Sequence, residues 1–119
     1  MTNKTNKNVL TKADFFNLKT KIEPLEVEGL GTIYIKTMTA SEREGLENHF
    51  EGEADKNGIR ALVFIYSVCE EDGSLVFGLE DLEKVKGLPS KIVGDVFDKS
   101  DELNNIVPKN KAVAEAAKN

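Results

Sequence analysis

The sequence has no tryptophan, and it has one cysteine, one histidine and three prolines in 119 residues. A single cysteine, Cys69, excludes an internal disulfide bond, and its apolar neighbours favour a reduced, buried thiol. Metal sites need clustered Cys, His, Asp or Glu at set spacings, and Cys69 and His49 stand far apart in the chain. We therefore expect no metal and no cofactor.

An excess of positive charge is also lacking. The net charge is −5, which argues against a nucleic-acid-binding protein, because phosphates select a basic surface. The longest apolar run is shorter than the roughly 20 residues that span a bilayer. The polar N-terminus has no apolar segment typical of a signal peptide. We expect an intracellular protein that binds neither nucleic acid nor membrane.

Catalytic motifs are missing as well. The segment Gly29-Leu30-Gly31 lacks the third glycine, the following helix and the Lys-Ser/Thr pair of a phosphate-binding loop. Cys69 and His49 lack a third group that would orient them as a nucleophile pair. The acidic residues occur in polar runs, which is typical of a solvated surface. We expect no enzyme activity.

One strongly apolar stretch is present, from Gly58 to Phe77, and it is the best candidate for the centre of the core. Residues 61–69 are apolar apart from Ser67, and the turn Glu70-Glu71-Asp72-Gly73 follows. Periodicity alone leaves helix and strand open for residues 59–69. The β-branched and aromatic residues favour a strand, whereas the length favours a buried helix.

Clearer patterns lie on both sides of this stretch. Residues 25–36 predict a β-hairpin, because alternating apolar residues flank two glycines. Thr39 and Glu42 form a capping-box pattern for a helix over residues 40–50, and further helices are expected over 78–86 and from Pro89 to about Asn104. An earlier helix is expected from Thr11 to about Ile22, where Pro24 would stop it.

Charge is distributed unevenly along the chain. Residues 1–22 hold five lysines against one aspartate, whereas residues 70–83 hold six acidic and no basic residues. Basic ends around an acidic middle favour head-to-tail self-association, and a solvated surface with flexible ends is the alternative. We expect a disordered segment over 1–9, one domain over 10–107, and a flexible Lys/Ala-rich tail over 108–119.

The order of several segments resembles a known family. Gly-Leu-Gly-Thr-Ile-Tyr-Ile-Lys leads into Met-Thr-Ala-Ser-Glu-Arg, and the apolar stretch ends in Val-Cys-Glu-Glu-Asp-Gly-Ser-Leu-Val-Phe. Leu-Glu-Asp-Leu, Gly-Leu-Pro, Val-Phe and Glu-Leu-Asn follow in that order. From about Leu25 to Asn105 the chain resembles the tail assembly chaperones of long-tailed bacteriophages and prophages.

The resemblance implies an α+β fold that is mainly α, with a small N-terminal β-hairpin followed by a compact set of about four helices. It therefore favours a helix over residues 59–69. It implies a non-enzymatic tail assembly chaperone that binds and solubilises the tape measure protein before the tail tube polymerises. Such a protein acts in the host bacterial cytoplasm and is absent from the mature virion.

The resemblance also bears on partners. It implies self-association, with a frameshifted longer form and the tail tube protein as further partners. For the partner-binding surface we single out Leu103, Ile106 and Val107, where apolar residues run past the end of the last helix; the alternative is that they seal the core. The alternative function is a small structural or adaptor protein that is retained in the phage tail.

Overall fold

The computed structural model describes residues 9–51 and 58–107, and its sheet begins with the predicted hairpin. Strands β1 (Ile22–Val27) and β2 (Gly31–Lys36) pair in antiparallel register, from Ile22 opposite Lys36 to Val27 opposite Gly31. Gly29 and Gly31 have φ values of 81° and 144°, which L side chains rarely adopt. The predicted hairpin is confirmed, and its first strand starts three residues earlier than expected.

The first helix is shorter than predicted. Helix α2 spans Lys12–Phe16, and the predicted cap is present because Thr11 and Asp14 exchange two hydrogen bonds. The prediction that this helix continues to Ile22 is wrong. Ile22 begins β1, and Pro24 lies within that strand, which is at the edge of the sheet. An edge strand tolerates a proline because its outer N–H groups need no partner strand.

The helix after the hairpin begins where the capping pattern predicts. Helix α3 spans Ala40–Glu51, with Glu42 N donating to Thr39 Oγ1 at 3.1 Å and Thr39 N donating to Glu42 Oε1 at 2.9 Å. After it comes helix α4 (Ile59–Ser67), followed directly by the short strand β3 (Val68–Cys69). Strand β3 pairs with β2, so the sheet order is β1-β2-β3.

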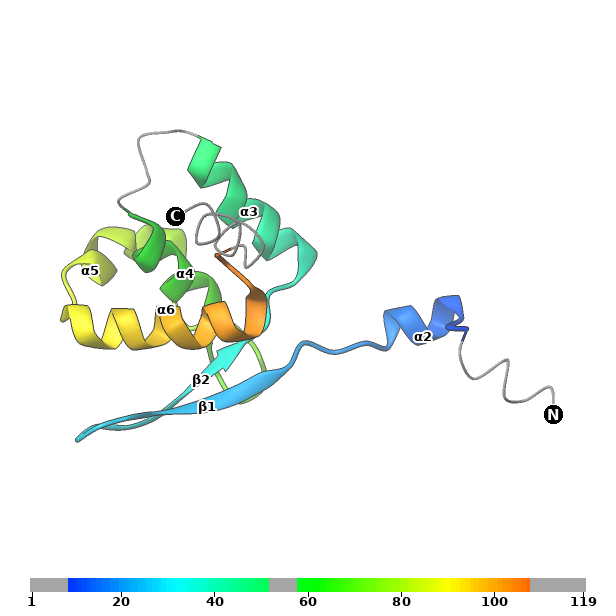
Figure 1. The fold of residues 1–119 in the computed structure, drawn as a ribbon, viewed down its shortest axis with the longest axis horizontal. Helices are drawn as coiled ribbons and strands as arrows, with labels where there is room; N and C mark the ends of the chain where they lie inside the picture. Colours follow the sequence, from blue (N-terminus) through cyan, green and yellow to red (C-terminus); the bar gives the residue numbers. More distant parts are fainter. Residues whose placement is uncertain (1–8, 52–57, 108–119) are drawn as a thin grey trace, which may run out of the picture.

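The last two predicted helices are also present. A 3-10 turn, η2 (Leu79–Asp81), leads into helix α5 (Leu82–Lys86). Helix α6 (Ser90–Asn104) ends at Asn105, whose φ of 53° places it in the left-handed conformation of a helix cap. Figure 1 shows α6 lying along the hairpin, with α3 and α4 on its other side.

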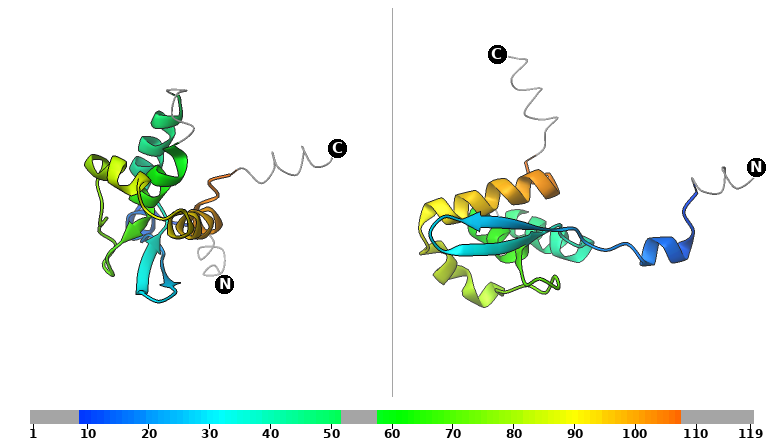
Figure 2. Two further views of the ribbon diagram at one scale, coloured as in Figure 1. Left: turned by 90° about the vertical axis from the view of Figure 1, so that its left-hand side faces the viewer. Right: turned by 90° about the horizontal axis from the view of Figure 1, so that it is seen from below.

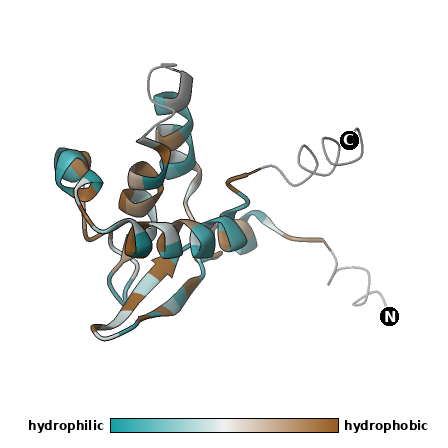
Figure 3. Ribbon diagram, turned by 60° about the vertical axis from the view of Figure 1, so that its left-hand side comes forward, coloured by the Kyte–Doolittle hydropathy of each residue, from teal (hydrophilic) through white to brown (hydrophobic). Residues whose placement is uncertain are grey.

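Helix α4 is buried on two sides, and this explains why its sequence shows no period. One face, with Ala61, Phe64 and Ile65, packs in a core cluster against Ile35 of β2 and against α6. The opposite face, with Leu62 and Val63, packs in a second cluster. In Figure 3 hydrophobic colouring gathers on the ribbon between α6 and α3. A helix that is apolar all round is expected to be buried.

The predicted fold class is confirmed: the fold is α+β and mainly α, with a hairpin ahead of four α-helices within the described residues. The predicted disordered start and the Lys/Ala-rich tail fall, apart from Val9, outside the described residues. Among residues 9–51 and 58–107, no helix combines the length and the apolar character that a membrane span requires. The predicted single domain over 10–107 stays a prediction.

Candidate functional site

The structure places the three residues singled out from the sequence in different surroundings. Leu103 is half-buried and packs against the cluster that contains Ile35. Ile106 is buried in the second cluster, with Leu46, Leu62 and Val63. Val107 is 43% exposed, and its N–H donates to the Asp101 carboxylate at 2.8 Å. Val107 is therefore the one of the three that offers a partner an accessible side chain.

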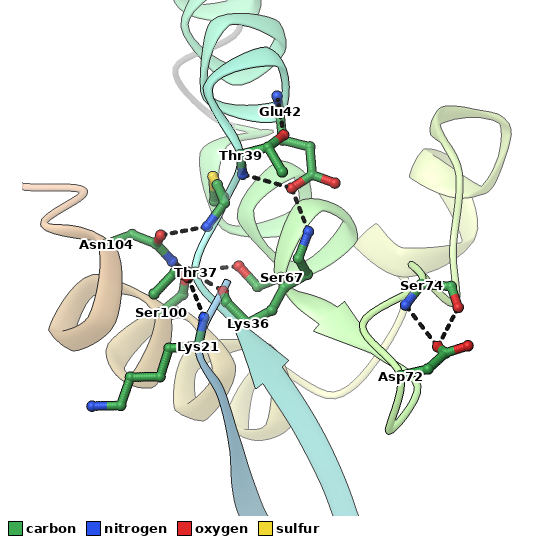
Figure 4. Close-up of polar contacts among 11 residues, drawn as sticks. Lys21, Lys36, Thr37, Thr39, Glu42, Ser67, Asp72, Ser74, Ser100 and Asn104 are labelled. Atoms are coloured by element: carbon green, nitrogen blue, oxygen red, sulfur yellow. Dashed lines mark hydrogen bonds and ion pairs between the residues drawn. The ribbon is translucent and has the colours of Figure 1, made fainter. Parts of the chain in front are cut away.

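Hydrogen bonds fix the exit of α6 to the rest of the fold, as Figure 4 shows. The Asn104 amide accepts from Met38 N at 2.7 Å and donates to Lys36 O at 3.3 Å. Ser100 and Ser67 share a buried hydrogen bond of 2.6 Å between their hydroxyl groups. These contacts join α6 to α4 and to the end of β2, so the surface around Val107 is held in place.

An apolar groove opens beside the hairpin, and we call it the hairpin groove. Its volume is about 480 Å³. Strands β2 and β3, the segment after β3 and the start of α6 all contribute to its lining. Its apolar lining residues are Ile33, Phe64, Val68, Val76, Phe77, Leu88 and Ile92. Two of these lining residues, Phe64 and Phe77, form an aromatic pair with ring centroids 5.4 Å apart.

Hydrogen bonds order polar residues that line the hairpin groove and the turn that follows β3. Tyr34 donates its hydroxyl to Glu71 at 3.2 Å, and this bond to a carboxylate raises the pKa of Tyr34. Asp72 accepts from Ser74 N at 2.9 Å and from the Ser74 hydroxyl, which lowers the pKa of Asp72. Burial raises the pKa of the Cys69 thiol. A thiol with a raised pKa is a poor nucleophile at neutral pH.

A second groove adjoins the first at the tip of the hairpin, and we call it the tip groove. Its volume is about 600 Å³. It shares Leu88 and Ile92 with the hairpin groove, and Leu30 of the turn stands at its edge with 83% exposure. Its remaining lining residues are Glu26, Val27, Glu28, Pro89, Lys91 and Asp95.

The described residues form no constellation with evident catalytic geometry. Cys69 lines the hairpin groove, whereas His49 lines a different, shallow pocket with Gly45 and Tyr66. No group of three or more His, Cys, Asp or Glu side chains in the described part of the chain is placed to hold a metal ion. What the surface does offer is apolar area in grooves, which suits the binding of another polypeptide.

Sequence reasoning missed both grooves. They are assembled from strands, a loop and a helix that are distant in sequence, so no local pattern marks them. The segment Gly87-Leu88-Pro89 contributes to the family resemblance and separates two predicted helices, but nothing in its sequence marks it as part of a groove. The one available signal was Leu30, a large apolar residue between two turn glycines, where a polar residue is the usual choice.

No protein-family model matches the sequence, and no curated protein matches it significantly. Among solved structures, the fold is similar to that of the tail assembly chaperone of bacteriophage HK97, with a TM-score of 0.59 and 14% sequence identity. The match covers 90% of this chain and 99% of that chain. The resemblance noted in the sequence is therefore confirmed at the level of the fold.

Proposed function

We propose that this chain is a non-enzymatic phage tail assembly chaperone that binds and solubilises the tape measure protein before the tail tube polymerises. The observation that carries the proposal is the fold shared with the HK97 tail assembly chaperone over almost the full length of both chains. The order of short sequence segments supports the same family independently of the fold.

The hairpin groove is the proposed seat for a helix of the tape measure protein. A long helix with an exposed apolar face aggregates, and an apolar groove can cover one stretch of that face. Val76 at the edge of the groove is exposed, and Leu88 is partly accessible beside it. A shallow contact of this kind is weak, so many copies along one helix supply the avidity while each can still be displaced.

Val107 is proposed to extend this contact surface at the exit of α6. Leu103 and Ile106 support its position from within the core. In this proposal the protein acts in the host bacterial cytoplasm, and the tail tube protein displaces it during assembly. It is then absent from the mature virion. Self-association and a frameshifted longer form belong to the same proposal.

Co-expression with the tape measure protein from the same phage or prophage tests the proposal. We expect the tape measure protein to become soluble in a complex that holds many copies of this chain, measured by pull-down and light scattering. If the tape measure protein stays insoluble and this chain elutes alone, the proposal fails. Finding this chain in purified virions would favour the alternative, a structural or adaptor protein of the tail.

Three substitutions locate the contact. Val76→Asp places a charge at the edge of the hairpin groove, and Val107→Asp does so at the exit of α6. Leu79→Asp is the matched control, because Leu79 is equally exposed and lies in neither surface. We expect Val76→Asp to leave the tape measure protein insoluble and Leu79→Asp to behave as wild type. If Val107→Asp also leaves the tape measure protein insoluble, the exit of α6 is part of the contact surface.

A further inference from the structure

The segment from Val9 to Thr20, which we call the arm, projects from the start of β1 away from the rest of the domain (Figures 1 and 2). Helix α2 lies within it and buries none of its residues. Five large apolar side chains of the arm are more than half exposed: Val9, Leu10, Phe15, Phe16 and Leu18. An exposed apolar cluster on so short a segment marks a surface that another surface covers.

The arm leaves the sheet at the end opposite to the tip groove. Lys21 N donates to Thr37 Oγ1 at 2.8 Å, and Thr37 N donates to Lys21 O at 2.8 Å, so the root of the arm is held in line with β1. A return to the tip groove of the same molecule requires the chain to reverse within residues 17–20. That stretch contains neither glycine nor proline. A second copy offers the same groove without a reversal.

The tip groove matches the arm in chemistry. Its apolar wall includes Leu30, which is 83% exposed, and Leu88 with Pro89. Phe16 of the arm is 80% exposed and has no core to enter. Large aromatic side chains that insert into apolar grooves are the usual anchors of protein contacts.

Charge favours the same pairing. Glu26, Glu28 and Asp95 line the tip groove against one cation, Lys91, which pairs with Asp95 at 3.1 Å. The arm itself carries Lys12 and Lys19 against one acid, Asp14, whose carboxylate accepts the Thr11 N–H of the helix cap. Opposite charge on the two surfaces steers their encounter and disfavours the approach of one arm to another.

We propose that the arm of one copy docks in the tip groove of a second copy, so that copies associate head to tail. The arm of the second copy and the groove of the first stay available, and such a heterologous contact therefore extends into open chains or closes into a ring. This inference names the surfaces for the self-association that belongs to the proposed function, and it does not depend on binding of the tape measure protein.

Complementation between two variants tests the proposal in the full-length chain. Phe15→Ser/Phe16→Ser disables the arm and leaves the groove, and Leu30→Asp disables the groove and leaves the arm. All three positions are exposed, so the fold should tolerate both changes. Size-exclusion chromatography with light scattering is expected to show that wild type grows with concentration, while each variant alone stays monomeric.

An equimolar mixture of the two variants is the decisive sample. One working arm and one working groove remain, so we expect a dimer that grows no further at any concentration. Leu79→Ser, an exposed apolar position outside arm and groove, should associate like wild type. In the variant that keeps its arm, Lys12→Glu/Lys19→Glu should weaken association about tenfold, as expected for the loss of two exposed ion pairs. Adding Glu26→Lys/Glu28→Lys to the variant that keeps its groove should restore association.

Three results would overturn the proposal. A wild-type chain that stays monomeric at all concentrations means that the arm is not bound by another copy. A Leu30→Asp variant that associates like wild type means that the arms bind each other or another surface. A mixture that stays monomeric means that arm and groove do not form one contact. None of these results bears on whether the tape measure protein is bound, because that partner is absent from the sample.

Discussion

Lys36 at the end of β2 and Glu42 in the first turn of α3 form a buried ion pair, with Lys36 Nζ 2.6 Å from Glu42 Oε1. Lys36 is only 4% exposed. The same carboxylate oxygen also accepts the backbone N–H of Thr39 that caps α3 (Figure 4). One side chain thus joins the hairpin to the helical part of the fold and starts the helix that follows.

Glu42→Gln should destabilise the protein by about 3 kcal/mol, because it leaves the buried Lys36 ammonium without a counter-charge. Glutamine can still accept the Thr39 N–H of the helix cap, so the loss of stability reports the missing charge alone. Lys36→Met should cost less, since the remaining carboxylate keeps the Thr39 N–H and reaches solvent. The double variant should resemble Lys36→Met alone, as urea unfolding will measure.

The control for this prediction is Asp95→Asn, which makes the same carboxylate-to-amide change in the exposed pair between Lys91 and Asp95. An exposed pair of this kind contributes only about 0.3–0.5 kcal/mol. If Glu42→Gln cost no more than this control, the pair would be a surface pair in solution, and its role as a link between hairpin and helix would be refuted.

Glu23 of β1 accepts from two lysines, with Lys99 of α6 at 2.8 Å and Lys21 at 2.9 Å. These bonds lower the pKa of Glu23, with Lys99 the larger cause. A depressed folded-state pKa adds stability that is present above the unfolded value of 4.5 and is lost as pH falls through the folded value. Glu23→Gln should therefore flatten the dependence of stability on pH in this acidic window.

Carboxyl titration by NMR provides the direct measurement. Lys99→Met should raise the pKa of Glu23 more than Lys21→Met does, because the Lys99 ammonium is less exposed than that of Lys21 and is screened less by solvent. A larger rise in the pKa of Glu23 with Lys21→Met would show that Glu23 interacts mainly with Lys21 and not with α6.

Local sequence patterns correctly predicted those elements whose structure is determined by residues close together in the chain. The Thr39–Glu42 cap and the glycine turn of the hairpin are formed by residues close in sequence, and both are present. Residues 59–69 could not be assigned by pattern, because α4 is covered on two faces and then becomes strand β3 without a break. The pairing of Val68 and Cys69 with β2 is what separates the strand from the helix before it.

Other features depended on contacts that the sequence does not reveal. The helix expected to reach Ile22 ends at Phe16, since Ile22 pairs with Lys36 of β2 and joins the sheet despite Pro24. No local pattern marks Lys36 as buried, because its burial follows from the position of α3. Of the three residues predicted to contact a partner, only Val107 is accessible. The two grooves could not be predicted, because they form only where the hairpin meets α6.

Gly45, in the middle of α3, is a position where intrinsic helix preference and packing oppose each other. Glycine in a helix interior costs roughly 1 kcal/mol relative to alanine. A Cβ at this position would lie 2.6 Å from the Tyr66 hydroxyl oxygen and 3.2 Å from its ring. The glycine therefore lets Tyr66 of α4 approach the backbone of α3.

Gly45→Ala should accordingly fail to stabilise the protein, because the gain in helix preference is offset by displacement of the Tyr66 ring. In a Tyr66→Leu background the obstacle is gone, and the same Gly45→Ala change should raise the free energy of unfolding by about 1 kcal/mol. Urea titrations of the four chains in this cycle measure the difference. An equal gain in both backgrounds would mean that Tyr66 moves aside freely and that its approach does not require the glycine.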